Sequence, residues 1–76
     1  MKVTVTDMEK FLKKIDACDG DIYLVYPQGG TENIRQNPRR QAELVDEWRS
    51  ARQHLELTLD LEEPMDAAHL LRFLKK

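Results

Sequence analysis

Apolar and polar residues alternate with a period of two in two parts of this chain, which is typical of strands that bury one face. Lys2 to Thr6 reads KVTVT, and Leu55 to Leu61 reads LELTLDL, with every leucine on one side. The apolar and aromatic run from Ile22 to Tyr26 indicates a third strand. Thr31 to Gln36 can return from it as a short polar strand with Ile34 pointing inward. The pattern therefore predicts four strands.

Helical spacing of apolar residues appears in three further segments. The first helix follows Thr6-Asp7-Met8-Glu9, which matches a capping box with Thr6 as the cap. It should end at Asp19-Gly20-Asp21, where Gly20 can adopt the left-handed conformation that ends many helices. The residues predicted to point inward from this helix are Met8, Phe11, Leu12, Ile15 and Cys18.

The second helix is expected from about Pro38 to His54, because Asn37 can cap it and proline suits the first helical position. Its inward residues are Leu44, Val45, Trp48 and Ala51. Asp66 can cap a last helix, and Lys75 and Lys76 suit the negative end of that helix's dipole. The inward residues of this last helix are Ala67, Leu70, Leu71 and Leu74.

The element order is thus β-α-β-β-α-β-α within one domain, residues 1–76. A split βαβ repeat of this kind predicts an α+β two-layer sandwich of the ferredoxin-like type, with an extra C-terminal helix. The alternative is a mixed sheet in which the first two strands are parallel and adjacent. In the sandwich, the helices cover one face of the sheet and leave the other face open.

The turn Pro27-Gln28-Gly29-Gly30 separates the second and third strands. A Walker-type phosphate loop needs a lysine after its second glycine, but Thr31 follows Gly30 here. The dinucleotide fingerprint needs three spaced glycines between a strand and a helix, which this segment lacks. We therefore interpret it as a hairpin turn in which glycine accepts a positive φ.

Composition places the chain among soluble proteins of the cytoplasm. Its apolar fraction is 41% and its charged fraction 34%, and no apolar run approaches the ~18 residues of a membrane span. The single Cys18 cannot form an internal disulfide, so no oxidising compartment is implied. The net charge is -2, but residues 53–66 carry no Lys or Arg, whereas arginines gather before them. This asymmetry could orient a binding partner.

Three arginines lie near the expected start of the second helix. Arg39 and Arg40 occupy its first turn, where the helix dipole disfavours cations and free amides attract anions, and Arg35 lies just before. This corner is a candidate site for a phosphate, a carboxylate or nucleic acid. The structural alternative is an ion pair on the helix surface between Arg39 and Glu43, four residues further on.

No pattern of catalytic or metal-ligating residues is present. His54 and His69 belong to no ligand motif, and Cys18 adds none. No nucleophile, base and orienting group can be assembled, so we expect a protein that is not an enzyme, with no catalytic residues, no metal and no cofactor.

The open sheet face is the other candidate surface. The predicted register places Tyr23, Val25 and Thr58 on it, and the remaining expected members are Thr4, Asn33, Arg35 and Asp60. RNA-recognition modules stack bases on such a face, but their aromatic and glycine motifs are absent here. A protein partner or a second copy of the chain fits the exposed pair of Tyr23 and Val25 better.

Three segments carry a resemblance. V-x-V-x-x-M-E-x-F-L, C-x-G-D-I-Y-L-V and L-x-L-T-L, beginning at Val3, Cys18 and Leu55, resemble short uncharacterised bacterial proteins. The resemblance implies a small intracellular bacterial protein and assigns no site residue. The sequence thus predicts a small binding or adaptor protein that acts through protein-protein interaction, with anion or nucleic-acid binding at the arginine corner as the alternative.

Overall fold

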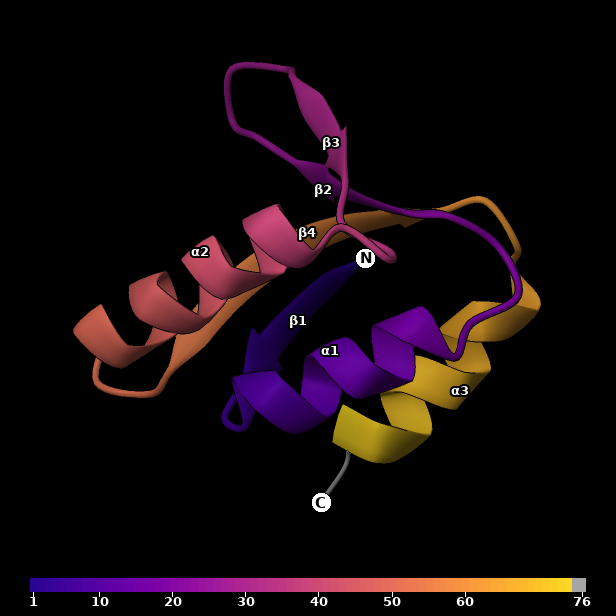
Figure 1. The fold of residues 1–76 in the computed structure, drawn as a ribbon. Helices are drawn as coiled ribbons and strands as arrows, with labels where there is room; N and C mark the ends of the chain where they lie inside the picture. Colours follow the sequence, from indigo (N-terminus) through magenta and orange to yellow (C-terminus); the bar gives the residue numbers. More distant parts are fainter. Residues whose placement is uncertain (75–76) are drawn as a thin grey trace.

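The computed structural model describes residues 1–74, so the interpretation of Lys75 and Lys76 lies outside the described residues. The elements, shown in Figure 1, are β1 (Lys2–Val5), α1 (Met8–Asp16), β2 (Ile22–Val25), β3 (Thr31–Asn33), α2 (Pro38–Ser50), β4 (Leu55–Leu61) and α3 (Met65–Leu74). The predicted order of strands and helices is confirmed. None of the described helices is long and apolar enough to cross a membrane.

The four strands form one antiparallel sheet in the order β1-β4-β2-β3. β1 and β2 therefore run in the same direction with β4 between them, and β3 and β4 do so with β2 between them. Both units are split βαβ motifs, but β4 and β2 occupy the centre, whereas a ferredoxin-like sheet has its first and third strands there. The ferredoxin-like arrangement is not confirmed. The alternative of adjacent parallel first strands is wrong, because β4 separates them.

One face of the sheet is buried beneath the helices. Its side chains belong to the hydrophobic core, whereas the alternate residues Lys2, Thr4, Glu56 and Asp60 are exposed. α1 contacts both α2 and α3, so the three helices form one layer (Figure 1). The buried residues of the sheet are Val3, Val5, Ile22, Leu24, Leu57 and Leu59. The predicted two layers, with one open sheet face, are therefore present.

α2 is tied to the sheet by Trp48, whose indole Nε1 donates a hydrogen bond to the backbone oxygen of Val5, 3.1 Å away. The cap of this helix is as predicted, because Asn37 accepts from the amide of Arg40 and proline stands at the helix start. The helix ends at Ser50 rather than at His54. Arg52 and Gln53 adopt left-handed φ values of 59° and 61° and turn the chain toward β4.

Both predicted ends of α1 are corrected by the structure. Asp7, not Thr6, is the N-cap, and its side chain accepts from the amide of Lys10. The helix ends at Asp16, and Gly20 does not adopt a left-handed φ. A glycine is required at position 20 for another reason: a Cβ there would lie 2.9 Å from Cβ and from the backbone nitrogen of Glu63.

The predicted cap of α3 is also wrong. Glu63 accepts from the amide of Met65, whereas the buried carboxylate of Asp66 accepts from the amides of Asp19 and Gly20 at 3.1 and 2.9 Å. Burial favours the neutral form of Asp66, but the two amide hydrogen bonds outweigh it and lower its pKa below the ordinary value. Asp66 therefore joins α3 to the loop that follows α1.

The interior matches the predicted inward residues of α1, all of which are buried. Cys18 is 3% exposed, and its thiol donates to the backbone oxygen of Lys14. Burial, followed by the nearby charge of Asp66, raises the pKa of Cys18 to about 11. The thiol therefore stays protonated at neutral pH and serves as a small core side chain.

Candidate interaction groove

A hairpin directs the end of β2 away from β4. Tyr26 donates its amide to the backbone oxygen of Gly30 at 2.8 Å, and Gly29 donates its amide back to the oxygen of Tyr26. Gly29 has a φ of 98°, so the predicted role of glycine in this turn is confirmed. β2 consequently pairs with β4 only from Ile22 to Leu24, opposite Leu59 to Leu61.

The first half of β4 has a strand partner on one edge. Its residues 55–58 pair with β1, and no described strand pairs with them on the other side. Leu59 exchanges both backbone hydrogen bonds with Met1, and the antiparallel alternation then directs the backbone groups of Leu57 toward β1 as well. The amide and carbonyl of Glu56 therefore face the unpaired edge. We call this segment the open edge of β4.

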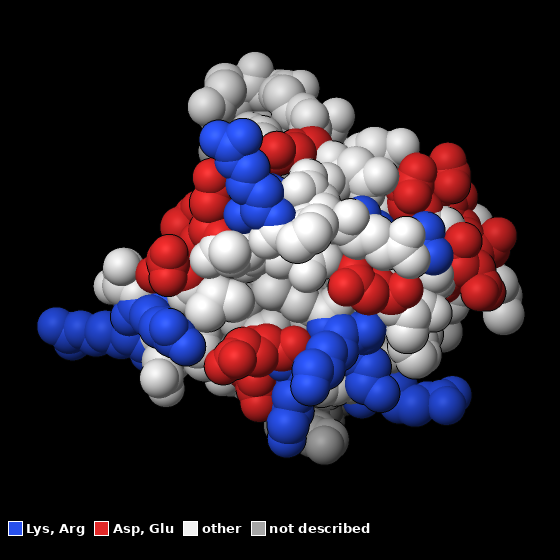
Figure 2. Space-filling view, in the orientation of Figure 1, with Lys and Arg blue, Asp and Glu red and all other residues white. Residues whose placement is uncertain are grey.

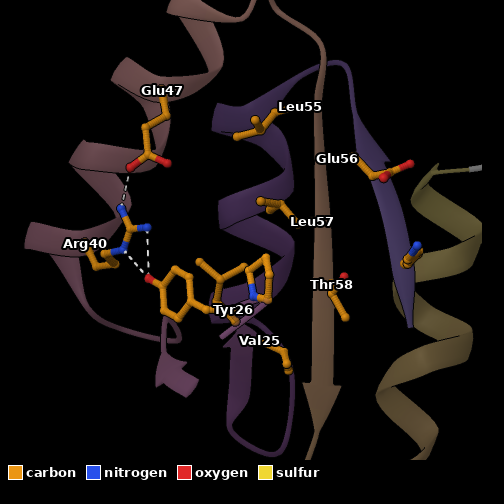
Figure 3. A pocket seen from close by; sticks show the side chains of 11 residues that line it. Val25, Tyr26, Arg40, Glu47, Leu55, Glu56, Leu57 and Thr58 are labelled. Carbon is orange, nitrogen blue, oxygen red and sulfur yellow. Dashed lines mark hydrogen bonds and ion pairs between the residues drawn. The ribbon is translucent and has the colours of Figure 1, made fainter. Parts of the chain in front are cut away.

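A groove of about 540 Å³ runs along this open edge (Figure 3). Leu55 and Leu57 project into it from β4, and Arg40 and Glu47 line it from α2. The other residues that line it are Lys2, Leu24, Val25, Tyr26, Pro27, Glu56 and Thr58. The groove thus combines aliphatic side chains with backbone groups that lack a strand partner.

Arg40 is held in place at the α2 side of the groove. Its Nη1 donates to Glu47 at 2.7 Å and to Glu43 at 3.3 Å, and its Nε donates to Glu32 at 2.9 Å. Its Nη2 donates to the hydroxyl of Tyr26 at 3.0 Å, and that hydroxyl donates to Glu32. The side chain is only 11% exposed. Burial opposes its charge, but the hydrogen bonds to Glu47 and Tyr26 outweigh burial and raise its pKa.

This arrangement, the Arg40 cluster, has a formal excess of negative charge, because one guanidinium lies among three carboxylates. It connects α2 to the hairpin through Glu32 and Tyr26. Sequence reasoning missed it, although the positions of Arg40, Glu43 and Glu47 at steps of three and four residues share one helix face. Tyr26 and Glu32 also lie on the two sides of the predicted hairpin turn, so the sequence could have indicated that their side chains are close.

The predicted arginine corner does not assemble into one site. Arg40 points into its cluster, and Glu43 pairs with Arg40 rather than with Arg39. Arg35 pairs with Asp21 at 3.6 Å, and its Nε is buried without a hydrogen-bond partner in the described chain. Arg39 is exposed and forms no ion pair with residues 1–74. The donors expected to converge on an anion are thus mostly used within the chain.

The predicted interaction face is divided by the structure. Val25 and Thr58 line the groove together, whereas Tyr23 lies on the outer face, paired with Asn33 on one side and Asp60 on the other. Slight burial, with the nearby carboxylates of Asp21 and Glu62, raises the pKa of Tyr23 above its ordinary value. Its phenol is therefore protonated and can donate a hydrogen bond. Arg35, expected on this face, lies beyond the end of β3.

Within residues 1–74, no group of three or more His, Cys, Asp or Glu side chains is arranged so that it could hold a metal ion. His54 and His69 are both exposed. Comparison of the chain with protein-family models, with curated proteins and with solved structures finds no match. The resemblance to short bacterial proteins therefore stays a prediction, and a function can be inferred only from the geometry of the molecule.

Proposed function

We propose that this chain is a small, non-enzymatic binding protein of the cytoplasm that receives an extended segment of a protein partner along the open edge of β4. The observation that supports this proposal is that residues 55–58 have no described partner strand on the edge away from β1, beside a groove of about 540 Å³. An extended segment that adds a strand gains main-chain hydrogen bonds from such an edge and gains specificity from side-chain pockets.

The lining of the groove indicates the chemistry of the segment. Leu55 and Leu57 offer an aliphatic floor, so an aliphatic side chain of the partner can bury its surface there, which contributes roughly 1.5–3 kcal/mol per side chain. On the α2 side, Arg40 and Glu47 line the groove, and Glu32 and Glu43 contact Arg40 from behind this lining, so carboxylates outnumber the guanidinium there. A Lys or Arg beside that aliphatic residue complements this negative excess. The segment is therefore expected to be extended, aliphatic and basic.

The outer sheet face extends the same surface. Val25 and Thr58 lie at the rim of the groove, and Tyr23 lies two residues before Val25, on the same face of β2. A phenol at the rim can supply both apolar area and one hydrogen bond, as is common for tyrosine in interfaces. The three residues predicted from sequence thus become the rim of the proposed site, with the open edge as its centre.

The test starts from peptides about ten residues long selected for binding from a random displayed library, a length that spans one strand and its flanks. We expect the selected peptides to combine aliphatic and basic residues. In an amide NMR titration they should shift the signals of residues 55–58 and of Val25. Peptides whose shifts map to α1 and α3 instead would exclude this site.

A pair of variants separates backbone from side-chain effects. Glu56→Pro removes the amide that faces the groove, whereas Glu56→Ala removes the same side chain and keeps that amide. We expect the proline variant to bind about tenfold more weakly than the alanine variant, equal to one hydrogen bond of ~1.4 kcal/mol, because both variants lose the same carboxylate. Thr58→Asp, which adds negative charge at the half-buried rim, provides a second test if the proline variant does not fold. It should strengthen the binding of basic peptides. Equal affinities throughout would contradict the proposal.

A further inference from the structure

A second groove lies between α1 and α3, on the outer side of the helix layer. Its volume is about 640 Å³, and its lining carries four formal cations, Lys10, Lys13, Lys14 and Arg72, together with His69 and Phe73. No Asp or Glu lines it. We call it the basic groove. It is separate from the open edge of β4, because the two share no lining residue.

Helical spacing explains why these cations gather. Lys13 and Lys14 lie three and four residues after Lys10, which places all three on one face of α1. His69, Arg72 and Phe73 have the same spacing on α3. The two helices contact each other, so the two rows meet along one channel. In Figure 2, several Lys and Arg side chains lie at the lower side of the view, over α1, with Asp and Glu side chains next to them.

The cations of the basic groove are not used by the fold. Within residues 1–74, Lys13, Lys14 and Arg72 form no ion pair, and Lys10 only reaches Asp7 at 4.0 Å with its side chain 73% exposed. Arg40 provides the contrast, since it is nearly buried among three carboxylates. The local excess of positive charge in this lining attracts anions, although the net charge of the chain is -2.

We propose that the basic groove binds the phosphodiester backbone of single-stranded nucleic acid, without base specificity. Lys10 and Lys14 are separated by about 6 Å along the helix axis, given a rise of 1.5 Å per residue, so each can contact a different phosphate of one strand. Arg72 contacts the same strand from α3. Long, solvated cations along an open channel are suited to a backbone that passes through it.

The geometry favours a nucleic-acid strand over a small anion and over an anionic membrane surface. A small anion is held by buried, fixed donors, and the cations of this groove are exposed lysines and an exposed arginine. A membrane surface needs protruding apolar side chains beside the cations. Phe73, the large apolar side chain of the lining, is instead partly buried and packs against the core, with its ring centroid 6.5 Å from that of Phe11. The exposed Met65 and Leu71 of α3 do not line the groove. The concave channel therefore fits a strand.

The test compares two triple variants of equal net charge. Lys13→Gln, Lys14→Gln and Arg72→Gln together remove three cations of the basic groove. Arg39→Gln, Arg49→Gln and Arg52→Gln together remove three exposed cations outside both grooves. Binding of a labelled uridine oligonucleotide of about twelve nucleotides is followed by fluorescence anisotropy at several salt concentrations. Far-UV circular dichroism verifies that both variants are folded.

Salt dependence gives the expected numbers. With four phosphates contacted, the affinity of the wild type should fall about 50-fold between about 50 and 200 mM salt, since each contact contributes ~0.7 to the logarithmic slope. The groove variant should lose only about threefold over the same range and should bind more weakly at low salt. The control variant should behave as the wild type does.

Three results would overturn the inference. One is the absence of oligonucleotide binding by the wild type at low salt. Another is an equal loss of affinity in both triple variants, which would reflect net charge alone. The last is a ligand of a different kind, identified either by full competition from a mononucleotide triphosphate or by binding to anionic vesicles but not to the oligonucleotide. All three leave the peptide test at the open edge of β4 unaffected.

Discussion

Asp66 is a residue whose charge has a definite structural use, because its buried carboxylate accepts from the amides of Asp19 and Gly20. We expect Asp66→Asn to lower the free energy of unfolding at pH 7 by about 1–3 kcal/mol, since two amides lose a charged acceptor. Urea denaturation measures this loss. Asp60→Asn, on an exposed strand position, is the control and should change stability little.

The direction of the pKa shift of Asp66 determines how the stability difference between the wild type and Asp66→Asn depends on pH. The pKa of Asp66 is lower in the folded protein than its ordinary value of 3.8, so its contribution is complete above that value. The contribution disappears as the pH falls through the folded pKa. The difference between wild type and Asp66→Asn should therefore be largest near neutral pH and shrink below about pH 4. A difference that is constant with pH would contradict the assigned role.

Gly20 and Gly30 form a matched pair at the residue scale. A Cβ at position 20 would meet the Glu63 backbone nitrogen at 2.9 Å, whereas the nearest atom at position 30 is Cδ2 of Tyr26 at 3.7 Å. We expect Gly20→Ala to lower the free energy of unfolding by about 1–3 kcal/mol through overpacking, and Gly30→Ala to change it little. Thermal or urea unfolding of both variants measures these changes in stability. Equal effects would show that the contact with Glu63 relaxes without cost.

Residue roles in loops were the least predictable from sequence. Gly20 follows a helical pattern and therefore indicated a left-handed cap, but its actual reason is a tertiary contact with Glu63. Asp66 stands at a position typical of a cap, yet it binds amides more than forty residues away in the chain. Local patterns contain no information on such partners. Asn37 and Gly29, whose roles are local, were predicted correctly.

At the scale of elements, the open edge of β4 predicts a pattern of hydrogen exchange. Leu57 and Leu59 direct their amides toward β1, whereas the amide of Glu56 faces the groove. We expect the Glu56 amide to exchange at least tenfold faster than those of Leu57 and Leu59, because a solvated amide opens without breaking a strand pair. Exchange followed by NMR measures this. Equal protection of residues 56 and 57 would show that the edge is closed in solution.

Most helices and strands could be predicted from the sequence. An element that buries one face has apolar residues at a regular spacing, and this spacing is visible within the segment itself. Leu55 to Leu61 is a strand with its central leucines buried, and Ile34 points inward as expected. The ends of α1 and α2 were not readable, because they depend on where the chain must turn to meet the sheet. The Arg40 cluster was missed for a similar reason. It joins α2 to a hairpin that is adjacent only in space.

At the scale of the whole molecule, the strand order was not predictable. The order of elements along the chain allows either β4 and β2, as observed, or β1 and β3, as in a ferredoxin-like sheet, at the centre. Both strand orders bury the same face of each strand. Leu59 lies between Leu24 of β2 and Met1, which is consistent with the central position of β4, but the apolar run from Ile22 to Val25 gave no reason to prefer β2 as its neighbour. The strand order matters for the proposed function, because β4 lies between β1 and the shorter β2 and extends beyond the end of β2. This extension is the open edge of β4.

The last helix tests whether the molecule unfolds as one unit. Leu70 of α3 is fully buried in the core that also contains Trp48 of α2, whereas Leu71 is 48% exposed. Leu70→Ala should lower the free energy of unfolding by about 2–5 kcal/mol, and Leu71→Ala by no more than about 0.5 kcal/mol. Trp48 fluorescence and far-UV circular dichroism should report the same shifted urea midpoint for Leu70→Ala, because one core connects both helices. If circular dichroism changed first while Trp48 fluorescence kept its midpoint, α3 would detach alone. The basic groove would then exist only when that helix is docked.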